Sequence, residues 1–170
     1  MPIVALLVGL PASGKDTLIN SGAFPGYEII SRDDILLGLG SGNYMENFNT
    51  IPGKIVDKHF FKMLSGTATS GRNAVVNATH LTLSRRRKVL NRFPGYFKVA
   101  VILPLPDFET FCLRNEKRKT EGGKYLPVSV YGQMLSIYDS VNDSEGFDVI
   151  KTLSENEKLN LEILIKNINK

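Results

Sequence analysis

Cysteine is scarce in this chain of 170 residues, which has a single one, Cys112. One thiol excludes an internal disulfide and a zinc site built from several cysteines, and it is typical of a reducing compartment. Internal repeats and low-complexity segments are also absent, so neither a repeat architecture nor a disordered chain is indicated. We therefore expect a cytoplasmic protein.

Long hydrophobic runs are missing as well. The apolar segment 1–8 has no basic flank and ends in a glycine-rich turn at Gly9, which makes it too short for a signal peptide or a membrane span. Apolar residues nevertheless make up 42% of the chain and charged residues 22%, as in ordinary soluble domains. Residues 1–170 are accordingly expected to form one domain, with segment 1–8 as a buried strand.

Positive charge exceeds negative charge only modestly, with 21 Lys and Arg against 17 Asp and Glu and a net charge of +4. This balance favours an anionic partner without requiring nucleic acid. The basic residues gather in two clusters, at 85–92 and 114–124. Each cluster is either a solvated helix face or part of a binding site.

Strand-like and helix-like segments alternate along the whole chain. β-Branched apolar runs predict strands at 3–8, 27–31, 73–77, 96–103 and 147–150. Helices are predicted after Gly14, near Asp33, from Pro52, near Thr82, Asp107 and Pro127, and over 156–169. The alternation predicts an α/β sandwich with a central parallel sheet of about five strands, helices on both faces, and ligands beyond the carboxyl ends of the strands.

A glycine-rich segment follows the first predicted strand and opens a helix, which is the context that a P-loop requires. Its backbone N–H groups and the Lys15 ammonium suit the phosphates of a nucleoside triphosphate such as ATP. The residues expected to bind this donor are Gly9, Pro11, Ala12, Ser13, Gly14, Lys15, Asp16 and Thr17.

Asp16 stands where a P-loop usually has the Ser or Thr that binds magnesium. A carboxylate is a good ligand for a hard cation, so Asp16 is a candidate Mg²⁺ ligand. The alternative is a negative charge that only stabilises the first turn of the helix.

Two adjacent carboxylates, Asp33 and Asp34, follow the second predicted strand. One of them is a candidate general base, because phosphoryl transfer commonly needs a single Asp near the attacking hydroxyl. The two cannot share a helix face, so the other one is expected to cap the helix.

A basic lid is predicted at about 114–127. Arg114 and Arg118 lie four residues apart on one helix face, and a Gly-Gly pair then loosens the chain. Both arginines are expected to be solvated without ligand and to stabilise charge that develops during transfer. The other basic cluster puts three arginines in the first turn of a helix, where they oppose its dipole unless an anion lies nearby or they point into water.

Taken together, these residues resemble the kinase domain of the phage 5′-polynucleotide kinases, within the wider group of P-loop kinases. The resemblance covers about residues 2–140. It is carried by the P-loop at 9–15, Arg-Asp-Asp at 32–34, Ala-Thr-His-Leu at 78–81 with two arginines at 85–86, and Arg-Asn-x-Lys-Arg at 114–118.

The resemblance implies a cytoplasmic enzyme of a bacterial or phage-infected cell that uses an NTP, Mg²⁺ and a 5′-hydroxyl acceptor. It implies that Lys15 contacts the donor phosphates, that Asp33 is the base, and that Arg118, assisted by Arg114, meets the donor phosphates. The acceptor site that it implies consists of Arg32, Asp33, Thr79, His80, Arg86 and Leu126.

The chain departs from the family at several positions. The acidic residue before the threonine is Ala78, preceded by Asn77, and the arginine that grips the acceptor's phosphate is Leu36. His80 replaces an asparagine, so it either binds the acceptor or is structural. No Asp-x-Asp-x-Thr motif occurs, which favours a kinase without a phosphatase half.

Three functions remain open at this point. The first is a kinase for polynucleotide 5′-hydroxyls or nucleoside 3′-phosphates. The second is a nucleoside or nucleotide kinase, which the loss of the arginine at Leu36 favours. The third, a non-catalytic NTP-binding module, has no use for a base and a lid.

Overall fold

The computed structural model describes residues 1–168 and has a five-stranded, wholly parallel sheet at its centre. The strands lie in the order β2-β3-β1-β4-β5. Their bounds are β1 (Ile3–Val8), β2 (Glu28–Ser31), β3 (Ala74–Asn77), β4 (Phe97–Ile102) and β5 (Val149–Thr152). The predicted α/β sandwich is thereby confirmed.

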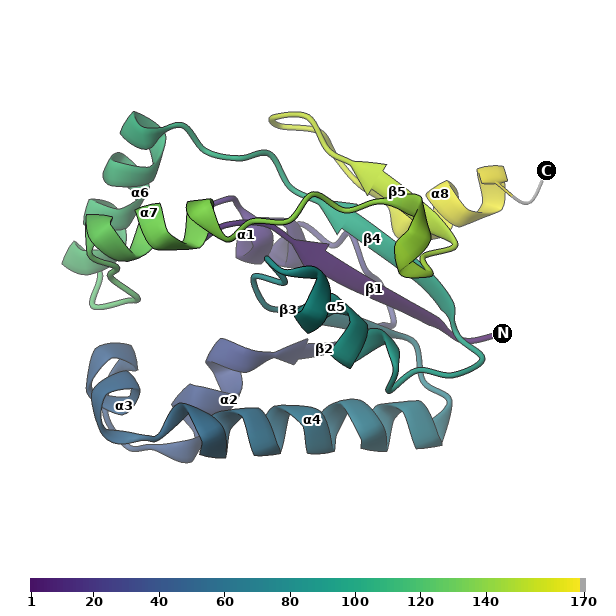
Figure 1. The fold of residues 1–170 in the computed structure, drawn as a ribbon, viewed down its shortest axis with the longest axis horizontal. Helices are drawn as coiled ribbons and strands as arrows, with labels where there is room; N and C mark the ends of the chain where they lie inside the picture. The colour runs from purple at the N-terminus through teal and green to yellow at the C-terminus, as the bar shows by residue number, and fades with distance from the viewer. Residues whose placement is uncertain (169–170) are drawn as a thin grey trace.

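Helices cover both faces of this sheet and extend beyond its carboxyl edge (Figure 1). Their bounds are α1 (Lys15–Asn20), α2 (Arg32–Leu39), α3 (Tyr44–Thr50), α4 (Gly53–Ser70), α5 (Leu83–Leu90), α6 (Phe108–Thr120), α7 (Val128–Ser136) and α8 (Leu161–Ile168), with a short 3₁₀ helix, η1 (Asp143–Glu145). No helix within residues 1–168 combines the length and apolar character needed to cross a membrane.

Alternating residues of β1 feed two separate cores. Leu7 packs with Leu18 of α1 and Leu161 of α8 on one face. Leu6 packs with Leu64 of α4 on the other face. Because burying such a side chain stabilises the fold by about 1.5–3 kcal/mol, both faces hold the central strand and, with it, the loop that follows its carboxyl end.

The lid is attached to this framework by a third core. Phe111 of α6 stacks on Tyr131 of α7 with ring centroids 3.8 Å apart, and both rings pack with Leu10 of the P-loop segment. Figure 1 shows α6 and α7 at the end of the sheet opposite both chain termini. The lid helices therefore stand over the carboxyl ends of the strands.

Two predicted elements need correction. The last strand is 149–152 rather than 147–150, since Phe147 joins a core and Asp148 pairs through its backbone N–H with the carbonyl of Lys98. The last helix begins at Leu161 rather than at 156, because Asn156 has a left-handed φ of 61°. Asn169, its predicted end, lies outside the described residues.

Helix α3 has no counterpart among the predicted helices. Its signal is a capping box, in which Asn43 and Glu46 each accept a hydrogen bond from the other residue's backbone N–H. The segment is short and polar, so periodicity alone did not indicate it.

Candidate active site

The P-loop wraps tightly around Ser13. A Cβ on Gly9 would lie 2.6 Å from Ser13 Oγ, and Gly14 has a φ of 96°, so both positions suit glycine. The Gly9 backbone N–H donates to the carbonyl oxygen of Thr79 at 3.1 Å. The end of β3 thus fixes where the loop leaves β1.

The side chain of Lys15 points back into the P-loop. Its Nζ donates to the carbonyl oxygens of Gly9 at 2.8 Å and Leu10 at 2.7 Å, and to Ser13 Oγ at 3.3 Å. Burial, helped by the nearby positive charge of Lys124, lowers the pKa of Lys15 to about 7. The negative charge of a bound phosphate would raise this pKa and favour the charged form of Lys15.

A cavity of about 630 Å³ lies beside the P-loop. This volume is in the range of small-molecule sites. Its walls include Ser13, Thr17, Leu103, Arg114 and Arg118, together with residues 153–158. The segment expected to begin the last helix is therefore a loop that lines the candidate nucleotide cavity.

The two lid arginines reach the P-loop. Arg114 Nη1 donates to the carbonyl oxygen of Ala12 at 2.8 Å, and Arg118 Nη2 lies 3.8 Å from Asp16 Oδ2. Arg114 is exposed, as expected, whereas the Arg118 side chain is only 30% exposed. Both guanidiniums already lie beside the segment that cradles phosphates.

Asp16 combines exposure with a defined orientation. Its side chain is 66% exposed, and its Oδ1 accepts a hydrogen bond of 2.9 Å from Asn77 Nδ2 at the end of β3. Within residues 1–168 no three His, Cys, Asp or Glu side chains cluster as a metal site. The single carboxylate nevertheless fits magnesium bound mainly by phosphates and water, which needs only one or two protein carboxylates.

Asp33 lies at the start of α2, held by one side chain from α3 and one from the loop after α6. Its Oδ2 accepts from Lys124 Nζ at 3.0 Å, and its Oδ1 accepts from Lys124 Nζ at 3.3 Å and from Tyr44 Oη at 3.0 Å. Burial raises the pKa of the Asp33 carboxyl, but Lys124, Tyr44 and Arg32 outweigh it and leave the pKa below its usual value.

The helix cap here is neither aspartate. Ser31 is the N-cap of α2, with its hydroxyl accepting from the Asp34 backbone N–H at 3.2 Å. Asp34 itself is exposed. The expectation that one of the two aspartates caps the helix is therefore wrong, because Ser31 supplies the cap.

Two residues of this cluster, Tyr44 and Lys124, were not predicted as site residues. Burial and the Asp33 charge raise the pKa of Tyr44 above its ordinary value, so it remains a hydroxyl donor. The capping box would have placed Tyr44 on a helix. No local pattern connects Lys124 with Asp33, because 91 residues separate them.

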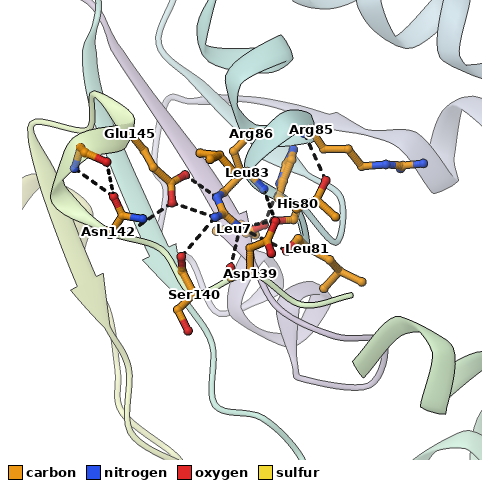
Figure 2. A network of polar contacts seen from close by, with 12 residues as sticks. Leu7, His80, Leu81, Leu83, Arg85, Arg86, Asp139, Ser140, Asn142 and Glu145 are labelled. Atoms are coloured by element: carbon orange, nitrogen blue, oxygen red, sulfur yellow. Dashed lines mark hydrogen bonds and ion pairs between the residues drawn. The ribbon is translucent and has the colours of Figure 1, made fainter. Parts of the chain in front are cut away.

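Arg86 has a different role from the one predicted. Its guanidinium is fully buried and pairs with Glu145, with Nη2 to Oε1 at 2.7 Å (Figure 2). Its Nη1 also donates to the carbonyl oxygens of His80, Leu81 and Asp139. With its donors used inside the protein, Arg86 is a structural residue rather than a substrate ligand. Glu145 is the anion that offsets the charge of Arg86, whereas Arg85 and Arg87 are exposed.

His80 and Leu126 are also buried, with exposed fractions of 3% and 7%. His80 Nδ1 donates to the carbonyl oxygen of Leu7 at 2.8 Å, while Nε2 has no partner. Burial lowers the pKa of His80 to about 4, so the ring is neutral at pH 7. Leu126 packs in the lid core and pairs through its backbone with the Asn115 amide, which corrects its predicted contact with substrate.

Arg32 and Thr79 border the ends of β2 and β3. Arg32 Nε donates to Asp57 Oδ1 at 2.8 Å, and Thr79 is partly buried. A smaller cavity of about 110 Å³ lies at this corner, lined by Arg32, Asp57, Phe60, Phe61, Ala78, His80, Arg85, Lys88 and Val89. Three of these side chains are cationic and one is acidic.

A model of the family described as AAA domain matches residues 4–140. No curated protein matches the sequence significantly.

Solved structures of kinases share the fold. A gluconokinase from Sinorhizobium meliloti 1021 has 19% identity and a TM-score of 0.62, covering 99% of this chain and 96% of that one. A sugar kinase from Janibacter sp. HTCC2649 has 18% identity and a TM-score of 0.62, covering 99% and 94%. The Pnkp1/Rnl/Hen1 RNA repair complex has 22% identity and a TM-score of 0.63, but covers 80% of this chain and only 43% of that one. At these identities the likeness shows the fold alone.

Proposed function

Since the chain belongs through residues 4–140 to the AAA domain family of P-loop kinases, we propose that it is an ATP-dependent kinase that phosphorylates the 5′-hydroxyl of a polynucleotide or a nucleoside 3′-phosphate. Kinase-type phosphotransfer follows from the family. The acceptor is the proposed part.

One observation carries the proposal: a donor site and a carboxylate base meet at one edge of the sheet. Lys15 follows β1 and Asp33 follows β2, with only β3 between the two strands. The charge of Asp33 contributes to the pKa of Lys15, as expected for neighbours in one site. A module that only bound nucleotide would need the lysine without the base.

The proposed reaction uses these groups in order. The P-loop backbone and Lys15 hold the donor phosphates, and the acceptor oxygen attacks the terminal phosphorus as its proton passes to Asp33. The bond from that phosphorus to the bridging oxygen breaks, its electrons remain on ADP, and Arg118 with Arg114 stabilises the charge. Asp16, oriented by Asn77, would hold a Mg²⁺ ion that neutralises phosphate charge.

The small cavity supports an acceptor that itself carries a phosphate. Leu36, which replaces the family's arginine, is only 1% exposed and packs with Tyr44 and Val56, so it offers no charge. Arg32, Arg85 and Lys88 provide cationic groups in its place. We propose that the acceptor's phosphate lies beside them.

The apolar burial of Leu36 also favours a second candidate, a nucleoside or nucleoside monophosphate kinase. Such an enzyme needs no grip on a 3′-phosphate remote from the acceptor oxygen.

A panel of acceptors separates these functions. The protein is incubated with γ-labelled ATP, Mg²⁺ and either a 5′-hydroxyl oligonucleotide, a nucleoside 3′-phosphate, a nucleoside, a nucleoside monophosphate or gluconate. Label on the first two supports the proposal, whereas label on the nucleoside or monophosphate alone supports the second candidate. Label on gluconate alone contradicts both, and no label on any acceptor supports a binding module.

Salt dependence gives an independent measurement. Affinity for a single strand should fall steeply as salt rises, because bound phosphates release counterions, whereas affinity for a mononucleotide should change much less. Arg85→Ala and Lys88→Ala should raise the acceptor KM on the proposed function. Arg87→Ala, an exposed position on the same helix, is the matched control.

A further inference from the structure

Lys124 lies in the loop between α6 and α7 and reaches across the site to Asp33. The ammonium is 3.0 Å from Asp33 Oδ2 and 3.3 Å from Oδ1. It also lies 5.2 Å from the centroid of the Tyr44 ring, whose hydroxyl donates to the same carboxylate. The lysine side chain is only 22% exposed, so the ion pair lies inside the site rather than on the solvated surface.

The same ammonium acts on the donor side. Lys124 is, after burial, the largest influence that lowers the pKa of Lys15. The charged and titratable groups that act on Asp33 are Lys124 from the lid, Tyr44 from α3 and Arg32 from its own helix, and Asp33 also interacts with Lys15 of the P-loop. The charge of Lys124 therefore acts on both the phosphate-binding lysine and the candidate base.

The pairing as it stands opposes catalysis. A carboxylate hydrogen-bonded to an ammonium binds a proton less readily, and Asp33 must accept a proton from the attacking hydroxyl. An incoming triphosphate offers Lys124 a more highly charged anion than one carboxylate does. Lysine suits such an exchange, because its charge sits on a flexible stem, and Gly122 and Gly123 precede it.

We propose that Lys124 is a further catalytic residue that pairs with Asp33 in the free protein and moves to the terminal phosphate of the bound donor, which releases the base only when a donor is present. The proposal rests on the proposed function for the role of Asp33. No bond other than those of the transfer itself is made or broken: Lys124 stays protonated, Asp33 takes the hydroxyl proton, and ADP keeps the bridging oxygen.

The pairing is tested without any acceptor. The Asp33 carboxyl is titrated by NMR with ¹³C-labelled aspartate, in the wild type and in Lys124→Ala, with and without Mg²⁺ and β,γ-imido-ATP. In the free protein the pKa of Asp33 should be higher in Lys124→Ala. The analogue should raise this pKa in both proteins through its negative charge, but by more in the wild type, which also loses the ammonium. An equal rise in both proteins overturns the proposal.

Kinetic measurements then test whether Lys124 contributes to catalysis. Lys124→Ala should lower kcat by about 10²-fold, the usual effect of removing one donor from developing charge. It should also shift the acidic limb of kcat/KM for ATP, which reports the donor-free protein, to higher pH. The control is Lys119→Ala, an exposed lid position that pairs with Glu116, which should change neither quantity. A kcat for Lys124→Ala at or above that of the control overturns the catalytic role and leaves a simple inhibitory contact.

The two proposals fail in different ways. If no acceptor in the panel is phosphorylated, the proposed function fails, while the NMR titration still shows whether the donor takes Lys124 from Asp33. If an acceptor is phosphorylated and the titration shows equal rises, only the role of Lys124 fails. Lys124→Gln, which keeps most of the stem, replaces Lys124→Ala in both experiments should the alanine variant unfold.

Discussion

At the scale of single residues, Lys15 shows how burial prepares a group for its ligand. The ammonium is satisfied by two carbonyl oxygens rather than by an anion, and burial brings its pKa to about 7. A large part of the population is consequently neutral at pH 8, and a bound triphosphate favours the charged form.

Nucleotide binding should therefore take up a proton above pH 7. Because the pKa is about 7 in the free protein and higher with bound phosphate, affinity should be greatest below pH 7 and fall as pH rises above it. Calorimetry at pH 8 in two buffers of different ionisation enthalpy measures the uptake. Lys15→Arg, whose charge does not titrate, is the control, and an equal uptake by this variant would rule out Lys15 as the source.

Asp33 is expected to act on the chemical step alone. Asp33→Asn should bind ATP nearly as the wild type does yet lose kcat by roughly 10²–10⁴-fold, the usual contribution of a general base. Nucleotide affinity by calorimetry and turnover with the active acceptor are the two measurements. Near-normal turnover would make Asp34 the candidate base instead.

At the scale of elements, α6 supplies the arginines of the lid. Arg118 Nη2 lies 3.8 Å from Asp16 Oδ2, and the Arg118 side chain is 30% exposed. Arg118→Ala should leave the melting temperature nearly unchanged and lower kcat by about 10²-fold, since it acts on charge that appears during transfer. Arg114→Ala should have a smaller effect. A lower melting temperature with unaltered kcat per folded molecule would mean that Arg118 is structural.

The contact between α1 and the end of β3 joins two departures from the family pattern. Asp16 accepts from Asn77 where the strand lacks its usual acid, so we predict that Asp16 supplies the missing carboxylate for Mg²⁺. Asp16→Ala should raise the Mg²⁺ concentration for half-maximal activity, and Asp16→Ser should recover little.

Adding Ala78→Asp to Asp16→Ser should restore activity better than either change alone. Titrating Mg²⁺ against rate in these variants is the measurement. Unchanged metal dependence in Asp16→Ala, or no coupling beyond the sum of the single changes, would leave Asp16 as a helix charge only.

At the scale of the whole molecule, the Arg86–Glu145 pair connects α5 to the segment before β5. Glu145 is 6% exposed, and Arg86 is completely buried. Removing one partner of a buried pair leaves an uncompensated charge and typically costs about 3–5 kcal/mol. Arg86→Ala should thus lower the melting temperature by roughly 6–20 °C for a domain of this size.

Glu145→Leu should destabilise the protein similarly, and the double change Arg86→Met with Glu145→Leu should be more stable than Glu145→Leu alone, because no charge is then left unpaired. Arg87→Ala, at an exposed position, should stay within about 0.5 kcal/mol of the wild type. Melting curves of the four variants decide. Equal stability of Arg86→Ala and Arg87→Ala would show that the pair contributes nothing.

An early strand and an early helix of the chain were predicted better than the last helix. Segment 3–8 is a continuous apolar run and segment 53–70 has helical periodicity, and both formed the expected elements. Segment 156–160 was also expected to be helical. Instead the Glu157 carboxylate accepts from the Ser154 backbone N–H, and Asn160 caps the helix that begins at Leu161 by accepting from the Ile163 N–H. Hydrogen bonds between polar side chains and the backbone competed there with helix formation.

The sequence alone determined the P-loop, the parallel sheet and the edge at which Asp33 and Lys15 meet, because these follow from local spacing and from the rule that parallel strands present ligands at their carboxyl ends. Only the tertiary structure decided which basic residues are available to a substrate. Arg86 is taken by Glu145, 59 residues away, and Lys124 by Asp33, 91 residues away. A charge's partner depends on which segments pack together, and spacing along the chain carries no record of that.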